Sequence, residues 1–183
     1  MFSYYRKKIY LPLVNKNGGI IGKGERWEIH RKGILHRGFT AVILYKSHVI
    51  LQFRKHPVFD GVFDLSFSSH PYYKNNKLVD DIASIKESLK REWKVDVEEN
   101  LKITFLGKVK YRSKDKKGLI ENEIDYFYKL SLDQIPRINP DFAYGVTVIE
   151  KDRIKKGDFY PIPKSLLAPW VKAALKEKIF EKL

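Results

Sequence analysis

Two glutamates stand two positions apart in residues 118–128, a stretch whose alternating side chains predict a β-strand. Side chains at positions i and i+2 of a strand point to the same face, so Glu121 and Glu123 would project side by side. Carboxylates this close repel each other unless a cation or a shared proton lies between them. The pair therefore indicates a metal site or an acid/base pair, although a solvent-exposed strand face would also carry such residues.

Three histidines elsewhere in the chain could complete such a site. His30 and His36 flank residues 31–35, just before an apolar run, and His70 follows an irregular stretch. Each also fits an ordinary role as a buried hydrogen-bonded side chain or an exposed one. Three imidazoles and two carboxylates would suit a divalent ion such as Mg²⁺, Mn²⁺ or Zn²⁺, but their spacing alone does not show that they converge.

The length and composition set the protein class. We expect a single domain over residues 1–183, because a chain of 183 residues can bury a sizeable core without further supports. The absence of cysteine excludes disulfides, thiolate metal ligands and cysteine nucleophiles, and it fits a reducing compartment. No apolar run reaches the roughly 18 residues that span a bilayer, so the default expectation is a cytoplasmic protein.

The formal net charge of +14 raises the possibility of a nucleic-acid partner. The lysines are, however, scattered along the chain, and the short clusters are residues 114–117 and 155–156. This distribution argues against specific nucleic-acid binding and favours an anionic small-molecule substrate that the overall field attracts. The sequence leaves the oligomeric state open.

The elements that must position these residues are mostly strands. Short N-terminal strands are predicted within residues 1–23, an apolar hairpin over residues 39–53, a second hairpin over residues 101–130 and a strand over 146–149. A helix follows Asp80 as its cap, with Glu92 at the edge of its apolar stripe. The stripe comprises Leu78, Ile82, Ile85, Leu89 and Trp93. Another helix is expected over 165–180, within a C-terminal segment, 163–183, that packs on the same domain. Together these elements predict an α/β (α+β) fold with an α/β/α sandwich.

The order of three motifs resembles a known family. The motifs are Leu35-His36-Arg37-Gly38-Phe39, Phe63-Asp64-Leu65-Ser66-Phe67-Ser68-Ser69-His70-Pro71 and Gly118-Leu119-Ile120-Glu121-Asn122-Glu123. They are similar to successive motifs of type I isopentenyl-diphosphate isomerase, a family of the Nudix superfamily, and the likeness runs from about Gly19 to Trp170. The resemblance implies a Nudix-type α/β/α sandwich with a mixed sheet.

The resemblance also implies a set of site residues. Five positions match the family's metal ligands: His30, His36, His70, Glu121 and Glu123. Glu92 matches a helix carboxylate that helps to hold a second Mg²⁺ through the substrate diphosphate. Tyr111 matches the tyrosine beside the proton-transfer carboxylate Glu123, and Trp170 matches a tryptophan whose ring would stabilise a carbocation. Arg26 and Arg54 stand where basic residues contact the diphosphate.

Two departures from the family's pattern affect the expected chemistry. Ser68 stands where the family has a catalytic cysteine, and a hydroxyl is a much weaker acid than a thiol, whose pKa is about 8.5. A water or Ser69 could assist Ser68, but turnover by the family's route should be slow. In the helix, residues 86–95 keep only Glu92 of the usual metal-binding carboxylates, and Ser88 stands where the isomerases carry a phosphate-binding arginine.

The sequence therefore predicts an isomerase-like enzyme that interconverts isopentenyl and dimethylallyl diphosphate by protonation and deprotonation. One alternative is a Nudix hydrolase of another diphosphate, which the loss of helix carboxylates disfavours. A second is a catalytically impaired Nudix-fold binding protein. Since the arginine at Ser88 is missing, an isoprenoid monophosphate is a further possible substrate.

Overall fold

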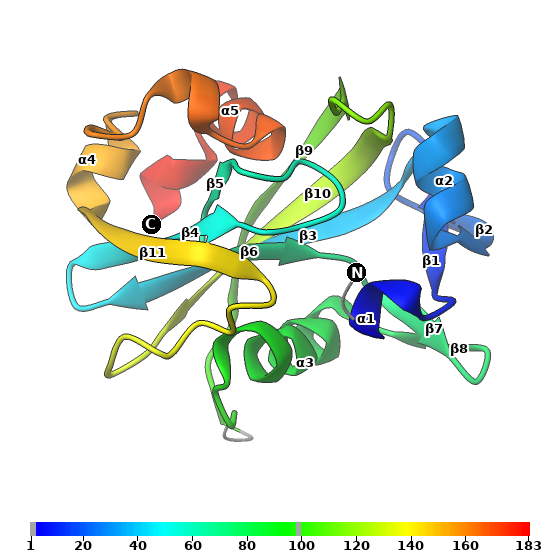
Figure 1. The fold of residues 1–183 in the computed structure, drawn as a ribbon, viewed down its shortest axis with the longest axis horizontal. Coiled ribbons are helices and arrows are strands. Elements are labelled where there is room, and N and C mark those ends of the chain that lie inside the picture. Colours follow the sequence, from blue (N-terminus) through cyan, green and yellow to red (C-terminus); the bar gives the residue numbers. More distant parts are fainter. Residues whose placement is uncertain (1–2, 98–99) are drawn as a thin grey trace.

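The computed structural model describes residues 3–97 and 100–183, which form a mixed sheet with helices on both faces (Figure 1). The described strands are β1 (Tyr10–Val14), β2 (Ile20–Glu25), β3 (His36–Tyr45), β4 (His48–Arg54), β5 (Phe63–Asp64), β6 (Phe67–Ser69), β7 (Tyr72–Lys74), β8 (Lys77–Val79), β9 (Thr104–Lys114), β10 (Ile120–Ser131) and β11 (Ala143–Glu150). The described helices are α1 (Ser3–Arg6), α2 (Arg26–Lys32), α3 (Asp81–Trp93), α4 (Lys151–Lys155) and α5 (Pro169–Lys176), with 3₁₀ turns η1 (Lys164–Leu166) and η2 (Ile179–Lys182).

The centre of the sheet is built from the two predicted hairpins. Strands β3 and β4 pair antiparallel, as do β9 and β10, and β10 lies parallel to β3. The parallel register places Glu123 opposite His36, and the antiparallel register places Tyr111 opposite Glu123. The mixed sheet expected from the sequence is therefore confirmed, and its central pairing brings distant motifs side by side.

Helices cover both faces of the sheet, which confirms the predicted sandwich. On one face, α3 packs its Ile85, Leu89 and Trp93 against apolar residues of the central strands. On the other face, the C-terminal segment with α4 and α5 covers a second core that includes Val42 and Phe127. Val42 and Phe127 lie on the same face of the sheet. Toward the starts of β3 and β10, the side chains on this face become polar, and the candidate site lies there.

Helix α3 follows the sequence prediction at its start but not along its stripe. Asp80 caps it, because the side-chain oxygen accepts a hydrogen bond from the Ala83 N–H at 2.9 Å. Leu78 lies in β8 and Ile82 is exposed, so the expected stripe was wrong at these two positions. Small and polar residues instead occupy part of the buried face, where Ser88 and Glu92 face the interior.

Both ends of α3 are held to the rest of the fold. At its start, the Arg37 guanidinium forms two hydrogen bonds to the Asp81 carboxylate, 2.6 and 2.9 Å long, and the Tyr128 hydroxyl donates a third. At its end, Asn139 donates to the backbone carbonyls of Arg91 and Glu92. The helix is thereby fixed at both termini.

Two helical segments differ from expectation. Helix α2 was not predicted; it ends at Gly33, which adopts a left-handed conformation with φ of 63° and is the sequence signal for that end. The helix expected over 165–180 is shorter, because Pro169 starts α5 and a proline fits the first turn rather than the interior.

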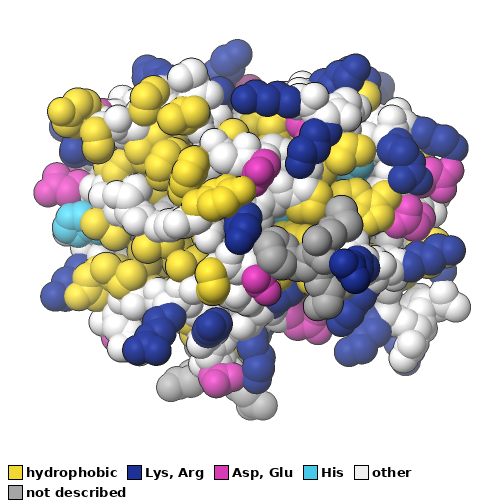
Figure 2. Space-filling view, in the orientation of Figure 1, with side chains coloured by type: hydrophobic (Ala, Val, Ile, Leu, Met, Phe, Trp, Pro, Cys, Tyr) yellow, Lys and Arg dark blue, Asp and Glu magenta, His cyan; other side chains and the backbone are white. Residues whose placement is uncertain are grey.

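The surface carries its positive charge broadly. Figure 2 shows Lys and Arg side chains spread over the visible face rather than merged into one continuous patch. Among the described helices, none has the length and apolar character needed to cross a membrane.

Candidate functional site

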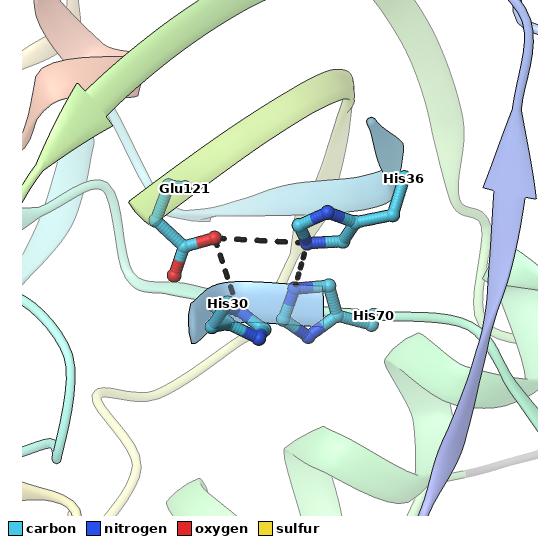
Figure 3. A group of neighbouring side chains, drawn as sticks. All are labelled: His30, His36, His70 and Glu121. Carbon is cyan, nitrogen blue, oxygen red and sulfur yellow. Dashed lines mark hydrogen bonds and ion pairs between the residues drawn. The ribbon is translucent and has the colours of Figure 1, made fainter. Parts of the chain in front are cut away.

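Four predicted metal ligands come together from four separate segments. His30 lies on α2, His36 starts β3, His70 follows β6 and Glu121 lies near the start of β10. One side-chain ligand atom from each lies within 4.8 Å of the others, and Figure 3 shows the rings and the carboxylate directed toward one another. Such a group of imidazoles and a carboxylate could hold a divalent metal ion.

Glu123 joins this cluster through direct hydrogen bonds. Its Oε1 lies 2.7 Å from His70 Nε2 and 3.1 Å from His36 Nε2. Its Oε2 accepts a hydrogen bond of 2.5 Å from the Tyr111 hydroxyl. Glu123 thus links the histidine cluster to Tyr111, as the cross-strand registers require.

Hydrogen bonds to the backbone fix how two of the imidazoles present their nitrogens. His30 Nδ1 donates to the carbonyl of Arg26 at 2.6 Å, and His36 Nδ1 donates to that of Ile34 at 2.8 Å. A ring that carries its single proton on Nδ1, as it would with a metal ion bound, directs an Nε2 lone pair at the cluster. This arrangement is typical of metal-binding histidines, whose other ring nitrogen is held by a carbonyl or carboxylate.

The surroundings of the buried Glu121 Oε2 indicate whether the cluster suits a cation. This oxygen lies 3.1 Å from His30 Nε2 and 3.7 Å from His36 Nε2, which are ion-pair distances. Among the described residues it nevertheless accepts no hydrogen bond of acceptable geometry. The atoms are therefore close but do not point along a hydrogen bond, as expected for donors that share one ion. The donor set and this unsatisfied oxygen fit a divalent metal.

The electrostatics of the cluster reflect burial and close carboxylates. Burial alone would lower the pKa of the His30 imidazole, but the negative charge of the adjacent Glu121 raises it to about 9. Burial would raise the pKa of Glu123, yet hydrogen bonds from two histidines hold it well below the usual range. Burial and the charge of Glu123 raise the pKa of the Tyr111 phenol, which therefore stays protonated.

Two other predicted residues lie near the cluster but are engaged elsewhere. Glu92 is buried on α3 and pairs with the Arg91 guanidinium at 2.7 Å, while burial raises the pKa of its carboxyl. Arg26 is also buried, and its Nη2 donates to backbone carbonyls of Tyr4, Tyr5 and Lys7. The structure thus uses Arg26 to hold the N-terminal segment, and its contact with a diphosphate stays a prediction.

Arg54, Trp170 and Ser68 converge on one buried carboxylate. Asp64 Oδ1 accepts hydrogen bonds from Trp170 Nε1 at 2.7 Å and from the Ser68 hydroxyl at 3.0 Å. Asp64 Oδ2 pairs with Arg54 Nη1 at 3.3 Å, and the Arg54 guanidinium lies over the Trp170 ring, 5.1 Å from its centroid. Asp64 therefore organises three of the predicted site residues.

Sequence reasoning assigned no role to several residues of this region. Asp125 lies two positions after Glu123, so on a strand its side chain points to the same face as the two glutamates. This spacing could have identified it from the sequence. Asp64 lies inside a recognised motif but has no comparable signal, because its partner Trp170 is 106 positions away. Arg91 was also missed; it donates to the Ser88 hydroxyl at 2.8 Å and so places a guanidinium beside this serine.

Two neighbouring cavities adjoin the cluster. A small one of about 20 Å³, close to the volume of one water molecule, has a lining that includes His30, His70, Ser68, Glu92, Tyr4 and Tyr5. A larger one of about 500 Å³ shares His70, Ser69 and Tyr4 with it. Its basic lining consists of Lys7, Lys8, Lys74 and Arg91. This larger cavity could hold an anionic group beside the cluster.

Comparison with known proteins found related sequences, although no family model matches the chain. The chain is 30% identical over 135 residues to an isopentenyl-diphosphate Delta-isomerase of Pectobacterium atrosepticum, covering 70% of this chain and 69% of that protein. It is 29% identical over 135 residues to isopentenyl-diphosphate Delta-isomerase 2 of Aromatoleum aromaticum, covering 72% and 67%.

Solved structures resemble the fold at lower sequence identity. DR0079 from Deinococcus radiodurans matches with a TM-score of 0.61 and 16% identity, covering 94% of this chain and 98% of that one. A MutT Nudix hydrolase from Burkholderia pseudomallei gives 0.52 and 18%, covering 81% and 98%. The Nudix domain of Shewanella oneidensis NrtR, complexed with ADP ribose, gives 0.51 and 18%, covering 80% and 86%.

Proposed function

The chain belongs to the isopentenyl-diphosphate isomerase family, and from this premise we propose that it interconverts isopentenyl diphosphate and dimethylallyl diphosphate with a divalent metal ion. Its Nudix fold, expected from the sequence, is confirmed by the solved structures. The observation that carries the proposal is the convergence of His30, His36, His70 and Glu121 beside the hydrogen-bonded pair Glu123 and Tyr111.

The metal would be held by the three imidazoles and Glu121, with Glu123 beside them. When bound, a divalent ion supplies positive charge that offsets the clustered carboxylates and the phosphates of the substrate. The chain's own residues orient these ligands, because backbone carbonyls fix the rings of His30 and His36.

The proton chemistry would occur on two faces of the alkene. Glu123, in its less populated protonated form, gives its proton to the terminal methylene carbon of isopentenyl diphosphate, and the Tyr111 hydroxyl holds the carboxylate that remains. The resulting tertiary cation loses a proton from the adjacent methylene group on the Ser68 side, and that C–H electron pair forms the new double bond. In the reverse direction Glu123 begins ionised, the form that its histidine hydrogen bonds favour.

Trp170 would shield the cation. Its indole is buried, with its ring centroid 6.0 Å from that of Tyr111, so it lies beside the residue that holds Glu123. The electron-rich face of an indole stabilises a nearby positive charge. The Arg54 guanidinium already lies over this ring, and its pairing with Asp64 offsets that charge.

The phosphates would lie in the cavity of about 500 Å³ whose lining includes Lys7, Lys8, Lys74 and Arg91. Arg91 lies beside Ser88, where the isomerases carry an arginine, and so offers a guanidinium from the next helical turn. The cavity borders His70, which brings a phosphate-bearing substrate next to the metal cluster. An isoprenoid monophosphate fits the same chemistry and is compared directly in the test below.

Hydrolysis of another diphosphate has less support. That reaction needs several carboxylates on α3 to hold the ions that activate water. In α3, Glu92 pairs with Arg91, and Glu87 accepts a hydrogen bond of 2.6 Å from the Tyr72 hydroxyl near the surface. These two carboxylates are engaged with protein groups rather than gathered into a shared site.

The test is ¹H NMR in D₂O with Mg²⁺ or Mn²⁺ and either isopentenyl diphosphate or the monophosphate. We expect the dimethylallyl product with deuterium in a methyl group, and no release of inorganic phosphate. Absence of both product and deuterium uptake at high protein concentration would reject the isomerase function. Phosphate release from a panel of diphosphates would instead favour a hydrolase.

A further inference from the structure

Ser68 lies in a row of close polar contacts between two buried carboxyl groups, in which its hydroxyl donates to Asp64 and the Thr40 hydroxyl donates to Asp125. Its Oγ is 3.0 Å from Asp64 Oδ1 and 2.8 Å from Thr40 Oγ1, which lies 2.7 Å from Asp125 Oδ2. Thr40 and Ser68 face each other across β3 and β6, so the sheet register fixes their contact. Ser68 also lines the small cavity beside His30 and His70, which places this residue next to the metal cluster.

Asp64 is built to accept a proton from Ser68. The residue is fully buried, and three donors converge on its Oδ1: Ser68, Trp170 Nε1 and the Leu65 N–H. Its Oδ2 pairs with Arg54, which offsets the charge of an ionised carboxylate. Burial raises the pKa of this carboxyl against the lowering effect of Arg54, so the carboxylate is a stronger base than an exposed aspartate.

A serine hydroxyl that takes a proton from carbon becomes a positively charged oxonium group, which is a very strong acid. The hydroxyl can therefore accept that proton only if it passes its own proton to a base. A cysteine thiolate needs no such partner, since it is already ionised when it accepts the proton. The exchange of a thiol for a hydroxyl therefore requires a base within hydrogen-bond reach of Ser68. Asp64 meets that requirement in position and in burial.

We propose that Asp64 is a positioning residue that makes Ser68 the proton acceptor, so that a Ser68–Asp64 relay replaces the family's thiol. The inference rests on the proposed isomerase function. As the methylene C–H bond of the cation breaks, its electron pair forms the double bond and its proton joins Ser68 Oγ. The original Ser68 hydroxyl proton moves to Asp64 Oδ1. In the reverse reaction Asp64 returns that proton and Ser68 protonates the same carbon.

The decisive experiment measures the effect of D64N in two backgrounds, the natural Ser68 protein and S68C, in the D₂O assay with Mg²⁺. We expect D64N to lower kcat/KM by about 100-fold with Ser68, the scale of a lost general base. In S68C we expect a loss of less than about tenfold, because the thiolate accepts the proton itself. Equal losses in both backgrounds would mean that Asp64 has only a structural role, and would overturn the relay.

A second measurement leaves Asp64 unchanged, in case D64N does not fold. With substrate deuterated at the methylene carbon, the relay predicts both a substrate and a solvent isotope effect in the Ser68 protein. In S68C the solvent effect should be smaller, because only the proton from Glu123 then comes from an exchangeable site, and solvent effects of equal size in the two proteins would overturn the relay. A rate-limiting substrate effect without a solvent effect in the Ser68 protein would overturn the relay while leaving the isomerase function intact. No isomerisation by either protein would reject the function itself, and the relay with it.

Discussion

The carboxylate of Glu123 occupies the space that a β-carbon on residue 38 would need. Gly38 lies on β3 beside β10, and a β-carbon built there would be 2.8 Å from Glu123 Oε2 and 2.9 Å from Oε1. The carboxylate cannot move aside freely, because His70 and His36 hold one oxygen and Tyr111 holds the other. A residue without a side chain is thus part of the site.

We expect G38A to displace Glu123 and lower kcat/KM at least about tenfold, because a shift of a fraction of an ångström breaks its short hydrogen bonds. The substitution adds no charge and removes no ligand. G145A is the matched control, since nothing lies within 4 Å of a β-carbon at that glycine. If G38A and G145A retain equal activity and equal metal content, the tight contact has no functional role.

Metal binding should stabilise the fold. Removing metal with a chelator should lower the thermal midpoint, and adding Mn²⁺ or Zn²⁺ at 100 times Kd should restore about 2.7 kcal/mol. E121Q should lose most of this gain, because it replaces the anionic carboxylate that carries the unsatisfied oxygen with a neutral amide. E28Q is the control, as Glu28 is an exposed carboxylate paired with Lys32. An equal gain in E121Q and the unaltered protein would place the ion elsewhere.

Metal affinity should depend on pH through His30. Glu121 raises the pKa of His30 to about 9, so below that pH the metal-free protein carries a proton that the ion must displace. The apparent affinity should weaken about tenfold per pH unit as the pH falls below 9, and it should level off above 9. Titration calorimetry in buffers of different ionisation enthalpy would count the released proton. Affinity independent of pH between 7 and 9 would contradict this assignment.

The basic cavity should set substrate affinity rather than the chemical rate. We expect K8A/K74A to raise KM several-fold with little change in kcat, because both lysines line this cavity and attract the charge of the phosphates. K16A/K46A removes the same net charge away from the residues that line this cavity. If both double variants raise KM equally, the general positive field accounts for substrate attraction and the local cavity does not.

The hairpins and the helix cap could be predicted from sequence because their signals are local. Continuous apolar runs marked the first central hairpin, alternating side chains over residues 118–128 marked a strand of the second, and Asp80 marked the start of α3. The C-terminal helix was predicted too long, although Pro169 carried the signal for its start.

The site was only partly predictable, because its organisation depends on contacts between distant segments. The residues that could ligate a metal stood out by type, whereas their convergence depends on the parallel pairing of β3 and β10. Asp64 gave no local sign of its role, since Ser68, Trp170 and Arg54 reach it only in the folded chain. The catalytic roles of Ser68 and Glu123 stay predictions.

Helix α3 is anchored at Asp81 and again by Asn139, whereas the guanidinium of Arg26 holds the segment that carries Tyr4 and Tyr5 through its backbone carbonyls. Opening of the small cavity on the side of this segment would therefore break the contacts of Arg26. Amide hydrogen exchange can distinguish movement of this segment from movement of α3. Substrate should change the exchange rates of the amides in residues 4–9. The slowly exchanging amides of α3 should keep their rates. Helix α3 would then stay in place, while the segment that carries Tyr4 and Tyr5 moves to let a five-carbon chain enter.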